Sequence, residues 1–380
     1  MTKKSSTPAI RFKGFTDTWE QRELSDLIIE YKETVDSDCT LPVLTSSKTE
    51  GVVLQEEHFG RVQNHDITGY NILPRNYCTY RNRSDGVDFT FNINRCCDKG
   101  IISKFYPVFY GDNSDIFFIS MVLNYCDEVV REIAYTCTGT GQKVLSFLDL
   151  QKMNIRVPSY DEQKKISQYF EQLDNLITLH QRECDKLTNV KKSMLEKMFP
   201  KNGSNVPEIR FKGFTEAWEQ RKLGDIVDVC SGRDYKHLSE GDIPVYGTGG
   251  YMLSVSEALS YDKDAIGIGR KGTIDKPYIL KAPFWTVDTL FYAIPREKID
   301  LNFAFDIFQN IDWKKKDEST GVPSLSKTAI NEIDVLVPQY FEQQALGEFF
   351  NGIDNLITLH QRELEKLKNL KKACLEKMFV

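Results

Sequence analysis

Residues 267–272, Gly-Ile-Gly-Arg-Lys-Gly, have the glycine spacing of a loop that binds the pyrophosphate of a dinucleotide. Such a site needs a helix that begins at the last glycine, because the helix N-terminus meets the phosphates. Pro277 follows shortly afterwards and disfavours a long helix there. We therefore interpret the segment as a tight loop that presents Arg270 and Lys271, with Thr273 beside them.

Other patterns that would carry catalysis are absent from the sequence. It contains no Gly-x-x-x-x-Gly-Lys-Ser/Thr motif, and its 13 prolines include no adjacent pair, which excludes the Asn/Asp-Pro-Pro-aromatic element of amino-methyltransferases. The five histidines are too scattered for a metal cluster, and the nine cysteines contain no Cys-x-x-Cys pair. We expect reduced thiols, no catalytic residue, no metal site and no cofactor bound by this chain.

The elements that must position these residues are duplicated. Three segments recur almost unchanged: 10–22 at 209–221, 174–183 at 354–363, and 195–199 at 375–379. The first recurs at an offset of 199 residues and the other two at 180, so the segment between the repeated ends changed in both sequence and length. Two copies favour pseudo-twofold internal symmetry over a solenoid.

The end of each copy has the periodicity of a long helix. Apolar side chains follow Tyr160 and Tyr340 in steps of four and three residues. A helix of about 33 residues is roughly 50 Å long, so an antiparallel coiled-coil pair would be a rigid spacer; ordinary core helices are the alternative. The residues expected at the seam are Ile166, Phe170, Leu173, Ile177, His180 and Leu187, and in the second copy Leu346, Phe350, Ile353, Ile357, His360, Leu364 and Leu367. The equivalent histidines are expected to form a hydrogen-bonded polar layer that fixes the register, with a metal or switch pair as the alternative.

The inserts between the repeated ends predict two globular domains of similar mixed fold. Both contain short β-type runs, such as residues 89–93 and 290–294, broken by Gly, Asn and Asp turns. The expected fold class is α+β, with the two domains joined and spaced by the two long antiparallel helices. The expected segments are an N-terminal repeat segment at 1–22, a domain at 23–158, a helix at 159–199, a linker and repeat segment at 200–221, a domain at 222–338 and a helix at 339–380.

Composition bounds the class of protein. Hydrophobic residues make up 41% of 380 residues, enough for more than one core. No window approaches the roughly 20 apolar residues of a membrane helix, so we expect no membrane segment and a cytoplasmic location. The net charge of -6 argues weakly against indiscriminate nucleic-acid binding, but it permits a local basic face.

Taken together, the repeats resemble the specificity subunit of type I restriction-modification systems. The resemblance is carried by Arg-Phe-Lys-Gly-Phe followed by Trp-Glu-Gln-Arg, and by two long helices that end in Leu-Glu-Lys-Met-Phe; it spans the whole chain. In that family two target-recognition domains each read one half of a split DNA target, and the helices hold them apart. The resemblance implies double-stranded DNA, two methyltransferase subunits and endonuclease or translocase subunits as partners. It also places S-adenosylmethionine and adenine N6 methylation on those partners. This chain itself is therefore expected not to be an enzyme.

Loops of the two inserts supply the candidate DNA contacts. Arginine suits the guanine edge, and Asn or Gln suits the adenine edge. The candidates are Tyr80, Arg81, Asn82, Arg83, Ser84, Thr140, Gln142 and Lys143 in the first insert, and Tyr246, Thr248, Arg270, Lys271, Thr273, Thr320 and Ser324 in the second. Each is a hypothesis, because a given Arg or Lys can instead merely solvate a turn or contact phosphate without reading sequence.

Two other classes of protein compete with this interpretation. A coiled-coil scaffold with two protein-binding globular ends would use the same helices, and salt-sensitive, sequence-dependent binding to duplex DNA would count against it. A self-sufficient DNA methyltransferase or nuclease would need a cofactor pocket that the sequence does not display. A lack of S-adenosylmethionine binding by the isolated protein would exclude that class.

Overall fold

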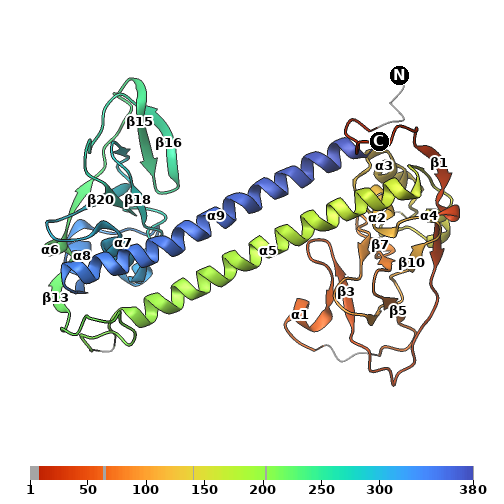
Figure 1. Cartoon of the computed structure of the whole chain (residues 1–380), viewed down its shortest axis with the longest axis horizontal. Helices are drawn as coiled ribbons and strands as arrows, with labels where there is room; N and C mark the ends of the chain where they lie inside the picture. Colours follow the sequence, from red (N-terminus) through yellow and green to blue (C-terminus); the bar gives the residue numbers. More distant parts are fainter. Residues whose placement is uncertain (1–7, 63–65, 140, 202, 380) are drawn as a thin grey trace. The chain divides into compact units, whose positions relative to one another are not determined.

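The computed structural model describes residues 8–62, 66–139, 141–201 and 203–379. The chain forms two compact units: unit 1 comprises Met1–Leu179 and Leu364–Val380, and unit 2 comprises His180–Glu363. Both units mix helices and strands, as the predicted fold class requires (Figure 1). The predicted segment boundaries follow the sequence repeat and stay a prediction.

Unit 1 is built around a small antiparallel sheet. Its elements before the first long helix are β1 (Glu20–Glu23), η1 (Leu24–Asp26), β2 (Ile28–Glu30), β3 (Leu44–Ser47), β4 (Gly51–Leu54), α1 (Gln55–Phe59), β5 (Asn71–Pro74), β6 (Cys78–Thr79), β7 (Arg83–Ser84), β8 (Asn92–Ile93), β9 (Lys99–Ile102), β10 (Val108–Gly111), α2 (Ile116–Tyr125), α3 (Asp127–Thr136), β11 (Lys143–Val144), α4 (Phe147–Gln151) and β12 (Asn154–Val157). Four strands form the sheet in the order β2–β10–β6–β8, and α2 packs against it. The strands β1–β12, β3–β4, β5–β9 and β7–β11 form separate pairs.

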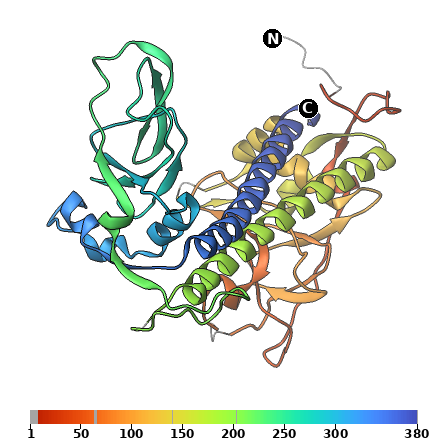
Figure 2. The same cartoon turned by 60° about the vertical axis from the view of Figure 1, so that its left-hand side comes forward.

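Unit 2 has a larger sheet and a hairpin layer. Its elements between the long helices are β13 (Glu219–Lys222), α6 (Leu223–Ile226), β14 (Val227–Ser231), β15 (Glu240–Gly247), β16 (Gly250–Val255), β17 (Ala265–Gly269), β18 (Tyr278–Leu280), β19 (Trp285–Thr286), β20 (Leu290–Pro295), α7 (Leu301–Asn310), η2 (Trp313–Lys316), α8 (Lys327–Asn331) and β21 (Asp334–Val337). The sheets run β14–β20–β17–β18 and β16–β15–β19, and β13 pairs with β21. Within this unit, Figures 1 and 2 show the β15–β16 hairpin on the opposite side of β20 from α7.

The long helices α5 (Tyr160–Met198) and α9 (Tyr340–Met378) each contain 39 residues. Pro158 and Pro338 separate them from β12 and β21, because proline suits the first turn of a helix but not a strand. Each helix begins in one unit and ends in the other. Of the residues expected at the seam, Ile166, Phe170, Leu173, Leu346, Phe350, Ile353 and Leu364 are buried, and Ile177, His180, Leu187, Ile357, His360 and Leu367 are partly buried. None of the helices in the described residues is both long and apolar enough to span a membrane.

Lysine–aspartate pairs join segments of the two long helices inside each unit. In unit 2, Lys191 Nζ lies 2.5 Å from Asp354 Oδ2. In unit 1, Lys371 Nζ lies 2.5 Å from Asp174 Oδ1. The lysines that interrupt the apolar seam therefore find carboxylate partners on the facing helix.

The repeated arginine of Arg-Phe-Lys-Gly-Phe holds the start of a long helix in each unit. Arg11 Nε and Nη2 donate to the two carboxylate oxygens of Glu162 at 2.6 and 2.7 Å. Arg210 donates to Glu342 in the same bidentate way, at 2.7 Å for both bonds. Both glutamates are buried, and the hydrogen bond to each carboxylate raises the pKa of its arginine. This contact explains why arginine and glutamate recur in both copies.

Helices α2 and α7 occupy equivalent places and are capped alike. Asp115 is the N-cap of α2 and Asp300 is the N-cap of α7, and each carboxylate accepts a hydrogen bond from a backbone N–H of the first turn. A glutamine of each long helix binds the cap. The side-chain oxygens of Gln163 and Gln343 accept the backbone N–H groups of Asp115 and Asp300 at 3.0 and 3.1 Å. The same polar contacts thus fix one helix to the next in both units.

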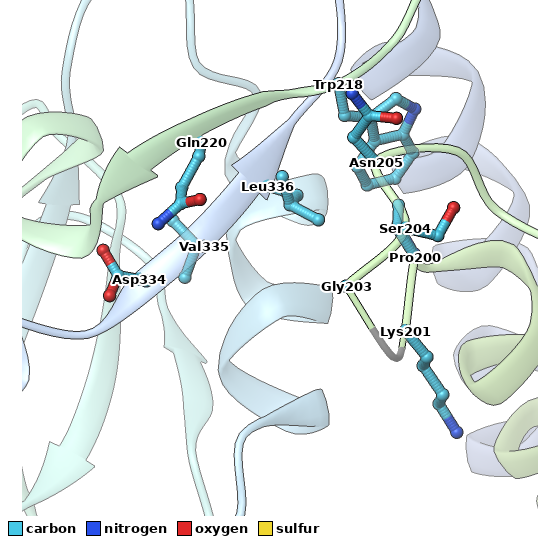
Figure 3. Close-up of a pocket in the computed structure, with 10 residues that line it drawn as sticks. All are labelled: Pro200, Lys201, Gly203, Ser204, Asn205, Trp218, Gln220, Asp334, Val335 and Leu336. Atoms are coloured by element: carbon cyan, nitrogen blue, oxygen red, sulfur yellow. The ribbon is translucent and has the colours of Figure 1, made fainter.

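Phenylalanines at the ends of the repeats complete the two cores. Their ring neighbours are Trp19, Phe118 and Phe170 around Phe379 in unit 1, and Trp218, Phe303 and Phe350 around Phe199 in unit 2. Trp218 is also held by the linker, because its backbone N–H donates to the carbonyl of Asn205 at 2.8 Å (Figure 3). A cavity of about 520 Å³ lies between this part of the linker and β21. The linker is thus packed as part of unit 2.

Candidate nucleic-acid interface

Unit 1 brings together two loops that were predicted separately. Strand β7 pairs with β11, so that Arg83 lies opposite Val144 and Ser84 lies opposite Lys143. The carbonyl of Asn82 accepts a hydrogen bond from the backbone N–H of Leu145, the residue after β11, at 3.0 Å. Candidate residues that are about 60 positions apart in sequence therefore lie side by side on one ladder.

Unit 2 repeats this arrangement. Lys271 forms an antiparallel bridge with Ser324, and Gly272 donates to the carbonyl of Pro323 at 2.9 Å. The carbonyl of Arg270 accepts the N–H of Leu325 at 3.0 Å, as Asn82 does in unit 1. The two sets of candidate loops are thus joined by equivalent hydrogen bonds in both units.

Glycines in these loops are required by close backbone contacts. A Cβ added to Gly269 would lie 1.9 Å from the carbonyl oxygen of Thr273. One added to Gly139 would lie 2.3 Å from the carbonyl oxygen of Gln142, and Gly139 also has a φ of +103°. Gly267 and Gly269 lie within β17, residues 270–272 follow this strand as a loop, and no helix begins at Gly272. The segment is therefore no dinucleotide motif, and the predicted loop is limited to its second half, which contains Arg270 and Lys271.

Asp317 shapes the second loop of unit 2. One carboxylate oxygen accepts the backbone N–H groups of Ser319 and Ser324, both at 2.9 Å. The hydrogen bond from Ser324, followed by that from Ser319, lowers the pKa of Asp317. Thr320 lies exposed between these two anchor points. The loop is therefore closed on its own backbone, with its tip open to a partner.

The candidate surface of unit 1 carries cations without counter-charges. Arg81 and Arg83 are exposed beside Lys143, and Lys104 lies on a neighbouring loop. Within the described residues none of these four forms an ion pair with a carboxylate. The guanidinium of Arg83 lies 4.6 Å from the centroid of the Phe105 ring, and Lys104 Nζ lies 5.9 Å from it. Cations that are held in place but unpaired are suited to phosphates and base edges.

The prediction that Tyr80 contacts DNA is corrected by its burial. Its side chain is fully buried, and its hydroxyl donates to the carbonyl of Leu145 at 3.0 Å. Burial raises the pKa of this phenol. Tyr80 thus supports the β7–β11 ladder from inside. The burial of Tyr80 was not predictable from the sequence, because the run Tyr-Arg-Asn-Arg has the composition of an exposed loop.

Unit 2 presents a cationic surface at the equivalent place. Arg270 is exposed, its guanidinium lies 5.8 Å from the Phe291 ring, and Nη1 donates to the carbonyl of Asp288 at 3.3 Å. Lys271 is exposed beside it. Arg233 is also exposed, and its backbone N–H binds the strand end at Thr286. Arg233 was not predicted to lie on this surface, because a single arginine after a strand carries no pattern.

The remaining candidates differ in their accessibility. The side chain of Gln142 is exposed, whereas those of Asn82, Ser84, Lys143, Thr248, Thr273 and Ser324 are partly buried. Tyr246 is half-buried against the Tyr278 ring, with 6.1 Å between ring centroids, so its side chain supports the hairpin. Thr140 lies outside the described residues.

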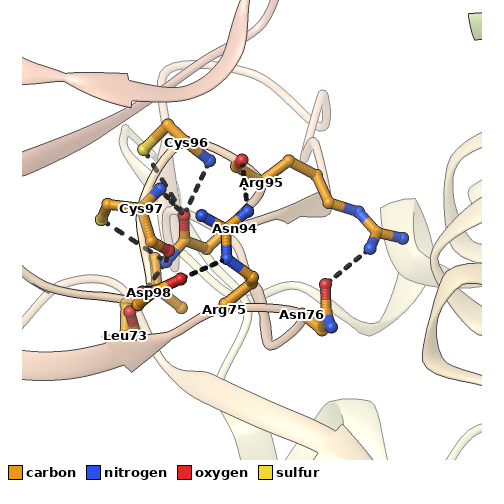
Figure 4. A network of polar contacts seen from close by, with 8 residues as sticks. All are labelled: Leu73, Arg75, Asn76, Asn94, Arg95, Cys96, Cys97 and Asp98. Atoms are coloured by element: carbon orange, nitrogen blue, oxygen red, sulfur yellow. Dashed lines mark hydrogen bonds and ion pairs between the residues drawn. The ribbon is translucent and has the colours of Figure 1, made fainter. Parts of the chain in front are cut away.

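Groups that could perform other chemistry are accounted for by structure. In unit 2 His180 Nδ1 and His360 Nδ1 are 3.0 Å apart, so one ring donates to the other in a polar layer. The described residues hold no group of three or more His, Cys, Asp or Glu side chains placed to bind a metal. In unit 1 the backbone N–H groups of Cys96 and Cys97 donate to the side-chain oxygen of Asn94 in a partly buried network (Figure 4). Burial, followed by the neighbouring Cys97, raises the pKa of Cys96 to about 11, the reverse of an activated thiol.

Comparison with known proteins gives the family. The model of the type I restriction-modification DNA specificity domain matches residues 107–189 and 215–369, more than half of the chain. The chain belongs to this family. The specificity subunit of the MjaVIII type I restriction enzyme of Methanocaldococcus jannaschii is 25% identical over 62% of this chain and 63% of its own length. The putative MjaX specificity subunit of the same organism is 23% identical over 62% of this chain and 60% of its own length. The chain thus spans about three-fifths of the length of these curated relatives.

A solved structure shares the fold over nearly the whole chain. The S subunit of a type I restriction-modification system from M. genitalium superposes with a TM-score of 0.70 at 17% identity. The match covers 98% of this chain and 99% of that one.

Proposed function

We propose that this chain is the DNA-recognition subunit of a type I restriction-modification complex and that it reads a split target, one half-site per unit. The observation that carries the proposal is the repetition of one loop arrangement in two units. Arg83 lies on the β7–β11 ladder of unit 1, and Arg270 directly precedes the equivalent bridge of unit 2, that of Lys271 with Ser324. Each of the two guanidinium groups lies near an aromatic ring. Two equivalent loop surfaces with different side chains suit two half-sites of different sequence.

The long helices would set the gap between the half-sites. We propose that α5 and α9 form a pseudo-twofold antiparallel coiled coil that acts as a rigid spacer between the units. A helix of 39 residues is roughly 58 Å long at 1.5 Å per residue. Successive base pairs of DNA are about 3.4 Å apart along the axis. Helix length would therefore determine how many base pairs separate two half-sites that are read from one face of the duplex.

The same helices would bind two methyltransferase subunits. Leu176 and Leu179 are 43% and 53% exposed, and their repeats Leu356 and Leu359 are 47% and 54% exposed. Exposed leucines in two identical segments suit two copies of one partner. We place S-adenosylmethionine, adenine N6 methylation and base extraction on those subunits, and cleavage on endonuclease subunits, in the cytoplasm. This chain would then be non-catalytic.

The first test is a genome-wide map of N6-methyladenine in the native cell, with and without this gene. We expect one motif, two short half-sites around a fixed unspecified gap, to lose methylation when the gene is removed. A change at an undivided motif, or at no motif while the complex is expressed, would contradict the proposal.

Binding experiments on that motif then assign the half-sites. Arg83→Ala and Arg270→Ala should each weaken binding to one half-site, by about 1–3 kcal/mol for a lost bidentate base contact. Arg75→Ala is a matched control, because Arg75 is an exposed arginine of unit 1 whose Nε is paired with Asp98 at 2.8 Å. An equal loss on scrambled DNA would reduce the tested arginine to a phosphate contact.

A further inference from the structure

The tip of the β15–β16 hairpin in unit 2 exposes two large apolar side chains. Tyr251 is 63% exposed and Met252 is 50% exposed. The segment 243–256 that contains them has no charged residue, in a chain of which 27% of residues are charged. Apolar side chains gathered on an uncharged protrusion mark a surface that contacts another molecule.

This tip is continuous with the cationic loop of the same unit. A Cβ added to Gly247 would lie 2.8 Å from the sulfur of Met252 and 3.6 Å from Cγ2 of Val287. The next residue after Val287 is Asp288, and its carbonyl oxygen accepts a hydrogen bond from Nη1 of Arg270 at 3.3 Å. The hairpin tip and Arg270 therefore both adjoin the 287–288 turn, in which Val287 is buried.

Packing beneath the tip holds it in place. The ring of Tyr251 meets Tyr246 edge-on, with 6.4 Å between centroids. The hydroxyl of Tyr278 donates to the carbonyl of Gly247 at 2.7 Å. The apolar side chains are thus presented on a supported hairpin, which lowers the entropy lost when they bind.

The corresponding hairpin of unit 1 has different chemistry at its tip. Lys48 is paired with Asp88, and His58 Nδ1 donates to the Glu50 carboxylate oxygen Oε2 at 2.6 Å. Charged side chains therefore occupy the turn of β3–β4. The two units differ here in what they can contact.

We propose that Tyr251 and Met252 contact the 5-methyl group of a thymine in the major groove of the half-site that unit 2 reads. This inference rests on the proposed function. The neighbouring Arg270 and Lys271 suit phosphates and polar base edges. The thymine methyl is the apolar group that base pairs present in the major groove, so it is the natural partner of an uncharged tip beside those cations.

The test replaces thymines by deoxyuridine, one at a time, in a duplex that carries the split motif. The substitution removes only the methyl group. We expect the full chain to lose about fourfold in affinity at one position of the half-site that Arg270→Ala identifies, which corresponds to about 0.8 kcal/mol for one buried methyl group. Tyr251→Ala with Met252→Ala should bind the thymine and deoxyuridine duplexes equally. Met252→Leu, which stays apolar, should still distinguish them.

The outcomes separate the two proposals. The inference on the hairpin is overturned if the parent chain binds its motif but distinguishes thymine from deoxyuridine at no position. It is also overturned if the double variant distinguishes the two bases as the parent does. In both cases the proposed function stands. If the chain, alone and with its methyltransferase, binds no split motif in preference to scrambled DNA, the proposed function fails and this inference falls with it. Unchanged thermal unfolding of the variants excludes misfolding as the cause of a loss.

Discussion

Replacing Glu342 by glutamine tests the contact that fixes the start of α9 in unit 2. The side chain of Glu342 is 2% exposed and that of Arg210 is 12% exposed. Glutamine keeps the volume and one acceptor oxygen, but it leaves the largely buried guanidinium without its paired carboxylate, with Glu216 as a further acidic residue nearby. Removing one partner of a buried ion pair costs about 3–5 kcal/mol. Arg210 keeps a hydrogen bond to the carbonyl of Glu216 at 2.6 Å, so we expect a loss near the lower end, about 3 kcal/mol in the free energy of unfolding.

Tryptophan fluorescence can measure this loss in unit 2 alone. Three of the four tryptophans, Trp218, Trp285 and Trp313, lie in unit 2, so the background variant Trp19→Phe leaves a signal from that unit. Urea unfolding of Glu342→Gln in this background should show a lower midpoint with an unchanged slope. The matched variant Glu162→Gln removes the equivalent contact of unit 1 and should leave the fluorescence transition of unit 2 closer to that of the parent.

Two further results decide whether the ion pair is the cause. The double variant Arg210→Leu with Glu342→Leu should recover most of the stability, because no buried charge is left unpaired. The hydrogen bond to Glu342 raises the pKa of Arg210 above its value in the unfolded chain. The stability that this ion pair contributes is therefore fully present below the unfolded pKa, and the loss caused by Glu342→Gln should be equal at pH 6 and pH 9. A loss below about 1 kcal/mol, the range of solvent-exposed pairs, would refute the reasoning.

Two other predictions concern unit 2. Asp306 is buried with one oxygen unpaired, and burial raises its pKa well above the usual value, so the stability of unit 2 should fall as pH rises from the unfolded aspartate pKa toward the folded one. Asp306→Met should therefore stabilise unit 2 by about 1–4 kcal/mol, because Lys191 keeps Asp354 as its partner. Urea unfolding should show a larger gain at pH 7.5 than at pH 4.5. An equal or smaller gain at pH 7.5 would mean that Asp306 is a charged partner of Lys191. Gly269→Ala should abolish binding to the half-site of unit 2, because the added Cβ meets the Thr273 carbonyl at 1.9 Å, whereas Gly321→Ala, with nothing within 4 Å, should bind as the parent does. Equal affinities of the two alanine variants for the motif would show that the loop does not need its present shape.

The long helices were predictable from sequence because their signal is periodic and long. The heptad steps predicted helices at 159–199 and 339–380, and α5 and α9 begin and end within two residues of these bounds. The loops were chosen by residue type alone. Their pairing was not predictable, because β7 and β11 contain two residues each and carry no alternating pattern. The burial of Tyr80 was missed for the same reason, since only the β7–β11 ladder places it beneath the loop.

The exposed tip of the β15–β16 hairpin was not predicted, because in the sequence it is marked by an absence of charged residues. The sequence predicts DNA contacts from Tyr246 and Thr248 as part of a further loop, whereas the exposed large apolar side chains of this hairpin are those of Tyr251 and Met252. Residue type suggests hydrogen bonds and ion pairs, whereas apolar recognition depends on exposure. Exposure is decided by long-range packing, such as the Tyr278 hydroxyl on Gly247, which a local pattern does not contain.

The identity of the repeated segments separates residues that serve packing from those that serve a partner. Arg11 and Arg210 recur because each binds a buried glutamate inside its own unit. Packing accounts in the same way for the repeated Phe199 and Phe379. It does not account for the four repeated leucines at 176, 179, 356 and 359, which are identical in both copies and face solvent. Half-exposed leucines contribute little to packing within a unit, so their repetition fits the partner surface proposed above. The hairpins, which differ between the units, fit the opposite role of contacting two different half-sites.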